Sequence, residues 1–222
     1  MAISKMKLKK LQGYLESVDV FENPKILLEQ YPTTPHIAAI MLHEIQTKFA
    51  DIDGCSVLDL GCGCGVLSIG CVMLGASYVL GIDVDEEALE VCQKNLEGFE
   101  IFNVDLLQQD IVNICPNSED ASEKLLSKKF DTVIMNPPFG TKKNKGIDME
   151  FVRTGLMMST NAVYSLHKSK TREHLEKKAQ DWGVTFDFLG QFKFNVKNTF
   201  KCHKQKEVDI EVDFVRFGHK NK

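Results

Sequence analysis

The chain of 222 residues has no apolar run that reaches the roughly 18 residues of a membrane span, so we expect no membrane insertion. Its first ten residues lack the apolar core of a secretory signal, and export is therefore not expected. The chain also lacks internal repeats, low-complexity tracts and linkers. With 43% hydrophobic residues it can build a sizeable core. We expect residues 1–222 to form a single domain, with residues 1–50 as a helical cap.

The chain offers little for disulfides or metals. Its cysteines are odd in number, seven in all, and most lie in predicted strands or helices, which indicates reduced core side chains. Cys62 and Cys64 suggest a zinc pair, but no second pair follows at the spacing of a metal site. Cys202 and His203 are better explained as structural or surface residues. We therefore predict no metal.

A glycine-rich turn lies between a predicted strand, 56–60, and a predicted helix, 64–74. Gly61, Gly63 and Gly65 allow the backbone to turn tightly and to approach a ligand. A second strand follows and ends at Asp83, where a βαβ unit places a carboxylate on ribose hydroxyls. Val66 breaks the dinucleotide spacing, and no lysine follows as in a P-loop. The pattern indicates a nucleoside-containing ligand other than a nicotinamide cofactor.

The tetrapeptide Asn136-Pro137-Pro138-Phe139 follows another predicted strand, 130–135. Two prolines fix the backbone and remove two N–H donors, so hydrogen-bond acceptors dominate this loop. Asn136 and the Pro137 carbonyl can accept both N–H groups of an exocyclic amine, and Phe139 can stack on its ring. The alternative is a rigid turn without a function.

Strands alternate with helices along most of the chain, which predicts a parallel sheet covered on both faces. The expected helices cover 25–30, 35–49, 64–74, 85–97, 147–160 and 170–181. The expected strands cover 56–60, 78–83, 101–105, 130–135, 161–166, 184–194 and 207–217. No helix separates the last two strands, so they should form an antiparallel hairpin at one edge.

Together, the glycine turn and the Asn-Pro-Pro-Phe loop resemble S-adenosylmethionine-dependent amino-methyltransferases. The resemblance becomes more specific in four strings and extends from Leu8 to Phe217; only 115–129 departs from it, as a surface-loop insertion. The strings are 28–33, 59–69, 133–141 and 162–168. They are similar to the methyltransferase-like protein five family, which methylates N6 of an adenosine in small-subunit (18S) ribosomal RNA. The implied fold is the seven-stranded, Rossmann-like class I methyltransferase fold.

This resemblance implies S-adenosyl-L-methionine as the cofactor, with Gln30, Thr33, Cys64 and Val66 among its contacts. Gln30 and Thr33 could equally have cap and turn roles. The glycine turn would approach the amino-acid part of the cofactor, and Asp83 would hold its ribose. Asp110 would accept from the adenine amine, with the Ile111 amide nearby, although Asp110 could also be a helix cap.

The net charge of −4 hides an asymmetry, because residues 140–222 carry +7 and residues 1–139 carry −11. Basic clusters occur at 142–145, 168–178 and 193–206. They would lie along a polyanion whose base enters at Asn136. The candidate RNA-binding residues are Lys142, Lys143, Lys145, Lys168, Lys170 and Arg172.

Other readings stay open. The substrate could be a protein glutamine amide or another RNA or DNA adenine, and a non-catalytic adapter could keep the same fold. The resemblance also implies a heterodimer with a small zinc-binding methyltransferase-activator protein, which would cover apolar residues near 77–82 and 99–104. It further implies residence in the nucleus, including the nucleolus, and in the cytoplasm.

Overall fold

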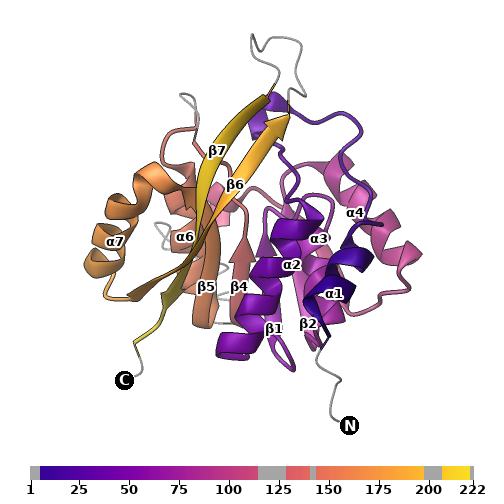
Figure 1. The fold of residues 1–222 in the computed structure, drawn as a ribbon, viewed down its shortest axis with the longest axis horizontal. Helices are drawn as coiled ribbons and strands as arrows, with labels where there is room; N and C mark the ends of the chain where they lie inside the picture. The colour runs from indigo at the N-terminus through magenta and orange to yellow at the C-terminus, as the bar shows by residue number, and fades with distance from the viewer. Residues whose placement is uncertain (1–5, 115–128, 141–143, 198–206, 221–222) are drawn as a thin grey trace.

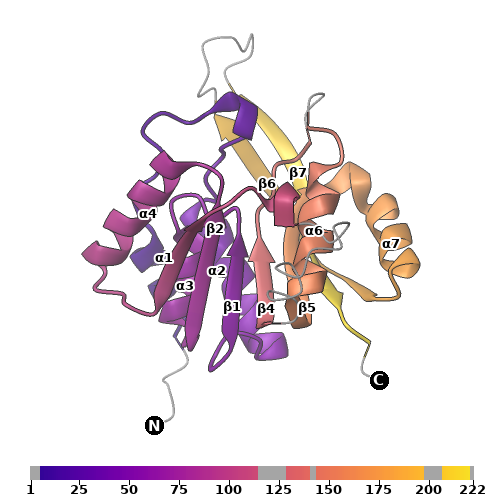
Figure 2. The ribbon, with the colours of Figure 1, turned by 180° about the vertical axis from the view of Figure 1, so that it is seen from behind.

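The computed structural model describes residues 6–114, 129–140, 144–197 and 207–220. A seven-stranded sheet lies at its centre (Figures 1 and 2). The strands are β1 (Ser56–Leu60), β2 (Tyr78–Asp83), β3 (Val104–Gln108), β4 (Phe130–Met135), β5 (Ser159–Lys168), β6 (Thr185–Lys197) and β7 (Glu207–Gly218). The α-helices are α1 (Leu8–Leu15), α2 (Pro35–Glu44), α3 (Val66–Met73), α4 (Glu86–Gly98), α6 (Ile147–Met158) and α7 (Arg172–Asp181). Short helical segments are η1 (Ile26–Leu28), η2 (Ile45–Phe49), η3 (Ile111–Ile114) and η4 (Ser169–Thr171).

The strands are ordered β3-β2-β1-β4-β5-β7-β6. The first five strands of the chain pair in parallel, whereas β7 is antiparallel to both β5 and β6. This order confirms the predicted mixed sheet with an antiparallel hairpin at its carboxyl-terminal edge. The strand order reverses between β1 and β4, which is the point where open α/β sheets bind ligands.

Helices cover both faces of the sheet, as Figures 1 and 2 show from opposite sides. One apolar cluster joins α1, α2, α3 and α4 to the first face through residues such as Leu42, Val57 and Tyr164. A second cluster joins η3, α6 and α7 to the other face through residues such as Leu58 and Val163. Neighbours on one strand, such as Val57 and Leu58, enter different clusters because successive side chains point to opposite faces. No helix within the described ranges has both the length and the apolar character of a membrane span.

Most predicted boundaries hold within a few residues, and local chemistry explains them. The Thr34 hydroxyl accepts from the Ile37 amide and Pro35 begins α2, as predicted. The predicted strand at 101–105 is wrong in its first half, because β3 begins only at Val104. The Asn103 side-chain amide donates to the Ala76 and Ser77 carbonyls, which holds this segment against residues 76 and 77 before the strand starts.

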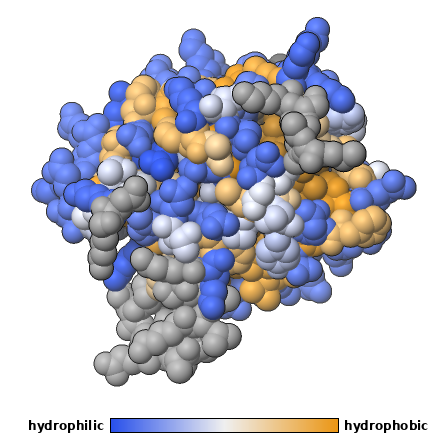
Figure 3. Space-filling view, turned by 90° about the horizontal axis from the view of Figure 1, so that it is seen from below, coloured by the Kyte–Doolittle hydropathy of each residue, from blue (hydrophilic) through white to orange (hydrophobic). Residues whose placement is uncertain are grey.

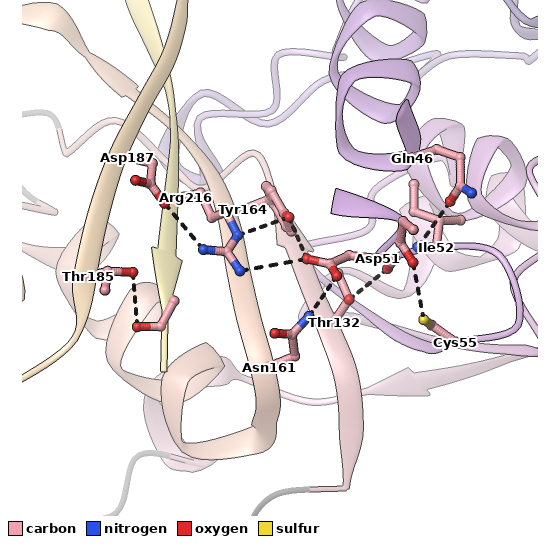
Figure 4. A network of polar contacts seen from close by, with 12 residues as sticks. Gln46, Asp51, Ile52, Cys55, Thr132, Asn161, Tyr164, Thr185, Asp187 and Arg216 are labelled. Atoms are coloured by element: carbon pink, nitrogen blue, oxygen red, sulfur yellow. Dashed lines mark hydrogen bonds and ion pairs between the residues drawn. The ribbon is translucent and has the colours of Figure 1, made fainter. Parts of the chain in front are cut away.

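A polar network ties the end of η2 to the sheet (Figure 4). The Asp51 carboxylate accepts from Asn161 at 2.7 Å and from the Tyr164 hydroxyl at 2.6 Å. The Arg216 guanidinium lies 3.8 Å from the same carboxylate and stacks over Phe49. Burial, followed by the hydrogen bond to Asp51, raises the pKa of Tyr164, so this hydroxyl stays a donor at neutral pH. The network therefore fixes α2 and η2 against β5 and β7.

The β6–β7 hairpin is longer than the rest of the sheet requires. The last residue of β5, Lys168, pairs with Val212, while β6 and β7 stay paired as far as Lys197 and Glu207. The hairpin therefore extends beyond the carboxyl ends of the parallel strands, at the top of Figure 1. On the face at the amino ends of those strands, polar and apolar side chains are interspersed (Figure 3).

Candidate active site

Three loops meet at the carboxyl edge of the sheet because three strands end in register. Leu60 at the end of β1 pairs with Ile82 of β2 on one side and with Met135 of β4 on the other. The residues directly after these three paired positions are Gly61, Asp83 (the last residue of β2) and Asn136. The glycine turn, the strand-end acid and the Asn-Pro-Pro-Phe loop are therefore neighbours, as the sequence predicted.

The glycine turn is held by backbone bonds and by an acid. The amides of Gly61 and Cys62 both donate to the Ile82 carbonyl, at 2.8 and 3.0 Å. The Gly63 amide donates to Asp83 Oδ2 at 2.9 Å. Gly61, Gly63 and Gly65 have φ values of +72°, +52° and +86°, which L side chains rarely adopt. The turn thus needs glycine for its conformation as well as for access.

Asp83 is a shielded carboxylate at the end of β2. Burial raises its pKa, and the amides of Asp85 and Gly63, which donate to its two oxygens, partly oppose that rise. Asp59 lies deeper and is 1% exposed, and its Oδ2 accepts from the Ser68 hydroxyl at 2.6 Å. Burial raises the pKa of Asp59 to about 7. The base of the glycine turn is therefore a low-dielectric region with two acids.

Asn136 has one half of its amide fixed and the other half unused. Its Nδ2 donates to the Thr33 hydroxyl at 2.9 Å. Its Oδ1 is buried and has no hydrogen-bond partner among the described residues. A buried acceptor without a partner is uncommon in folded proteins and is often found at functional sites. The next residue, Pro137, is buried, whereas Pro138 and Phe139 are half-buried.

Two adjoining cavities open at this edge, and Asn136, Gly61 and Gly63 line both of them. The larger cavity has a volume of about 220 Å³, and the smaller has about 60 Å³. All nine predicted cofactor residues line one or both. The larger is lined by Gln30, Gly61, Gly63, Asp83, Asp110 and Ile111, and the smaller by Thr33, Gly61, Gly63, Cys64 and Val66.

Some of these residues also have structural roles. The Gln30 amide donates to Asp85 at 2.6 Å and its carbonyl oxygen accepts from the Lys25 backbone at 2.7 Å. Asp110 accepts from the Val112 amide at 3.0 Å at the start of η3. Gln30 and Asp110 therefore have the cap or turn roles that were considered as alternatives to cofactor binding. Their contact with the cofactor stays a prediction.

The sequence reasoning missed several aromatic side chains of the cavities. Phe21 and Tyr31 line both cavities, and Phe151 of α6 lines the larger one. A Cβ atom added to Gly63 would lie 2.9 Å from the Phe21 ring, and one added to Gly61 would lie 3.2 Å from Phe151. Phe21 precedes Pro24 in an irregular segment, so no periodic pattern could have identified it.

The candidate RNA-binding residues are only partly described. Lys142 and Lys143 lie outside the described residues, while Lys145 and Lys170 are exposed and Lys168 is half-buried. The Arg172 guanidinium donates to Asp213 at 2.6 and 2.9 Å and lies over the Phe188 ring. Arg172 is thus anchored to the sheet, and its contact with RNA stays a prediction.

The cysteines near the site are buried thiols. Burial raises the pKa of Cys64 to about 12, with Cys92 and nearby acids adding to the effect. A thiol in this environment stays protonated at neutral pH. In the described part of the chain, no group of three or more His, Cys, Asp or Glu side chains is placed to hold a metal ion.

The strand order, the glycine turn and the Asn-Pro-Pro-Phe loop at the switch point define a Rossmann-like methyltransferase. Residues 31–137 match the family model for ribosomal protein L11 methyltransferase (PrmA). The solved structure of a candidate RNA methyltransferase from Pyrococcus horikoshii superposes with a TM-score of 0.79, at 32% identity over 96% of each chain.

Relatives across the whole chain identify the family more closely. The rRNA N(6)-adenosine-methyltransferase METTL5 of Danio rerio is 53% identical over 96% of this chain and 99% of its own length. Its counterpart in Drosophila melanogaster is 47% identical over 97% of this chain and 98% of its own. The chain belongs to the METTL5 family of rRNA N6-adenosine methyltransferases, which confirms the resemblance inferred from its motifs.

Proposed function

We propose that this protein transfers the methyl group of S-adenosyl-L-methionine to N6 of an adenosine in small-subunit (18S) ribosomal RNA. Membership of the METTL5 family supports the reaction and the rRNA substrate. One observation in the structure carries the proposal: the buried, unpartnered Oδ1 of Asn136, at the junction of two cavities. An exocyclic amine is the kind of donor that would satisfy this acceptor.

The two cavities fit the cofactor. The larger cavity combines a carboxylate, Asp83, with the apolar side chains of Ile111 and Phe151, which suits a nucleoside. The smaller one lies between the glycine turn and Thr33 and suits the amino-acid part. When bound, S-adenosylmethionine supplies a methyl carbon that is activated for nucleophilic attack. The residues of the chain need only orient the amine and the cofactor, which accounts for much of the rate in such reactions.

The target amine is a poor nucleophile because its lone pair is conjugated with the ring. Asn136 Oδ1 would accept one N–H bond, and the Pro137 carbonyl would accept the other. These acceptors would favour a pyramidal nitrogen and stabilise the positive charge that develops on it. Phe139 would stack on the base once the base has left the RNA helix. Transfer of the methyl group to this nitrogen would leave the cofactor as a neutral thioether, and the proton that the nitrogen gives up would pass to solvent.

The proposal is tested with Asn136→Ala and wild-type protein on unmodified small-subunit rRNA. Labelled methyl transfer is measured, the RNA is digested, and the nucleoside is identified; cofactor affinity is measured by calorimetry. We expect N6-methyladenosine only with the intact loop and similar cofactor affinity in both proteins. No transfer to rRNA by the wild-type protein, with cofactor binding intact, would favour a protein glutamine as the alternative substrate. A variant that loses cofactor binding yet keeps turnover would contradict the role of Asn136.

For RNA binding, we propose that Lys142, Lys143, Lys145, Lys168, Lys170 and Arg172 contact the phosphates. The charge of +7 in residues 140–222 supports this. Replacing Lys145 and Lys170 by Gln should weaken RNA binding and reduce its salt dependence, with the cofactor affinity unchanged. Equal salt slopes for the two proteins would contradict this.

We also propose a heterodimer with the small zinc-binding methyltransferase activator. Strand β3 is at the edge of the sheet, and Phe102 beside it is 90% exposed. An exposed edge strand next to a large apolar side chain is a common place for a partner to bind. Phe102→Ser should weaken co-purification with the activator, and full activity of the isolated chain would count against this partner. Residence in the nucleus, nucleolus and cytoplasm is a further proposal, which fractionation would test.

A further inference from the structure

The part of the β6–β7 hairpin that extends beyond β5 contacts the Asn-Pro-Pro-Phe loop. Phe194 pairs with Ile210, which is two residues beyond the partner of Lys168, the last residue of β5. At about 3.3 Å per residue, Phe194 lies about 7 Å past the end of β5. The Asn-Pro-Pro-Phe loop leaves β4 at the same edge, so the hairpin and the loop can meet there.

Phe194 contacts the last residue of that loop. The ring centroids of Phe194 and Phe139 are 5.9 Å apart, and the planes are at 88°, an edge-to-face arrangement. Phe194 is 2% exposed, so its ring is fixed by the core around it. Phe139 is only half-buried and keeps part of its surface free. One ring is therefore a fixed support and the other is a partly exposed surface.

The backbone on the amino-terminal side of Phe139 is restricted, and Phe139 packs against the first apolar cluster. Before it, Pro137 and Pro138 restrict the backbone, and Thr33 fixes the Asn136 amide. After it comes Gly140, with φ of +68°, which places no side chain against the ring. Among the aromatic contacts of the described residues, the ring contact to Phe139 comes from Phe194.

We propose that Phe194 is a positioning residue that holds Phe139 in the orientation needed to stack on the target adenine. The inference rests on the proposed function and extends it, because it assigns the extended hairpin a part in the substrate site. Phe194 would not touch the base. It would act by keeping Phe139 from rotating, so its loss should impair RNA methylation and leave cofactor binding intact.

The same strand provides a matched control. Phe192 lies two residues before Phe194, on the same face of β6, and its ring packs against Phe214 instead of Phe139. Phe194→Leu and Phe192→Leu thus each remove one aromatic ring from the same face of the hairpin. Phe194→Tyr keeps a ring that can make the edge-to-face contact.

The experiment measures kcat/KM for rRNA, cofactor affinity and melting temperature for the full-length variants. Loss of one edge-to-face contact predicts a fall in kcat/KM of about tenfold for Phe194→Leu, with the cofactor Kd unchanged. Phe194→Tyr should recover most of the activity. Phe192→Leu should stay within about twofold of wild type, because it leaves the contact between Phe194 and Phe139 in place.

A double-mutant cycle decides the role. If Phe194 acts through Phe139, adding Phe194→Leu to Phe139→Ala should cause no further loss. The same loss in both backgrounds, or an equal loss for Phe192→Leu, would overturn the inference and indicate a merely structural effect. Wild-type protein that forms no N6-methyladenosine would overturn the proposed function, and this inference with it.

Discussion

Replacing Thr33 by Val tests whether the side-chain amide of Asn136 must be held in place for the proposed methyl transfer. The Thr33 hydroxyl accepts from Asn136 Nδ2 at 2.9 Å, and Thr33 as a whole is 6% exposed, so water cannot easily replace the hydroxyl. Val has nearly the same shape but no hydroxyl. The substitution leaves a donor of Asn136 without a partner and allows the amide to turn, so that Oδ1 no longer faces the substrate.

The magnitude follows from the unsatisfied donor. Leaving a buried donor without a partner costs about 1–3 kcal/mol. A free energy of about 1.4 kcal/mol corresponds to a factor of ten in rate. If the whole cost falls on the transition state, kcat should fall about 5- to 150-fold. Since Asn136 is half-buried, we expect a value near tenfold to thirtyfold. Thr33→Ser keeps the hydroxyl and should remain within about threefold of wild type, because the acceptor is retained.

The assay is methyl transfer to rRNA at saturating cofactor, together with the cofactor Kd. On an Asn136→Ala background, Thr33→Val should have no further effect, because the group that it orients is already gone. The reasoning is refuted if Thr33→Val keeps its kcat and instead raises the cofactor Kd. The hydroxyl would then serve the cofactor, as the family resemblance implied.

Two further predictions concern the acids of the site. Asp83→Ala should raise the cofactor Kd at least tenfold by calorimetry, because it removes the predicted ribose acceptor and frees the Gly63 amide; an unchanged Kd would contradict this. Asp59 has its pKa raised from 3.8 to about 7, so its contribution to the free energy of unfolding is fully present below pH 4 and is lost as the pH rises through 7. Asp59→Asn should therefore make the denaturation midpoint less dependent on pH between pH 4 and pH 7. A variant whose midpoint changes with pH as much as that of the wild type would rule out this titration.

Much of the fold could be predicted because its signals are local. Alternating strands and helices indicate a parallel sheet, and the missing helix before the last strand indicates the hairpin. The start of β3 was misplaced because Asn103 binds the carbonyls of residues 76 and 77, which a linear pattern does not bring together. The extension of β6 to Lys197 could not be predicted either, because its register depends on pairing with a strand that follows it.

The site residues also divide into those that the sequence could predict and those that it could not. Asp83 ends β2, and the glycines and Asn136 come after β1 and β4, so their meeting at one edge follows from the topology. Phe194 contributes to the site through a contact across 55 residues of sequence, and nothing in its neighbourhood indicates this. For Gln30 the resemblance gave a cofactor role, while its hydrogen bonds to Asp85 and Lys25 show a structural one.

The unpartnered Oδ1 of Asn136 is the feature on which these observations bear. A folded chain gains nothing from burying an acceptor without a donor, since this costs about 1–3 kcal/mol. The surroundings nevertheless maintain it: Thr33 occupies the amide nitrogen, and two prolines remove the backbone donors that could have reached the oxygen. Each of these features would be a defect in a purely structural turn. Together they keep one acceptor available at the junction of the two cavities, which is what a site for an exocyclic amine requires.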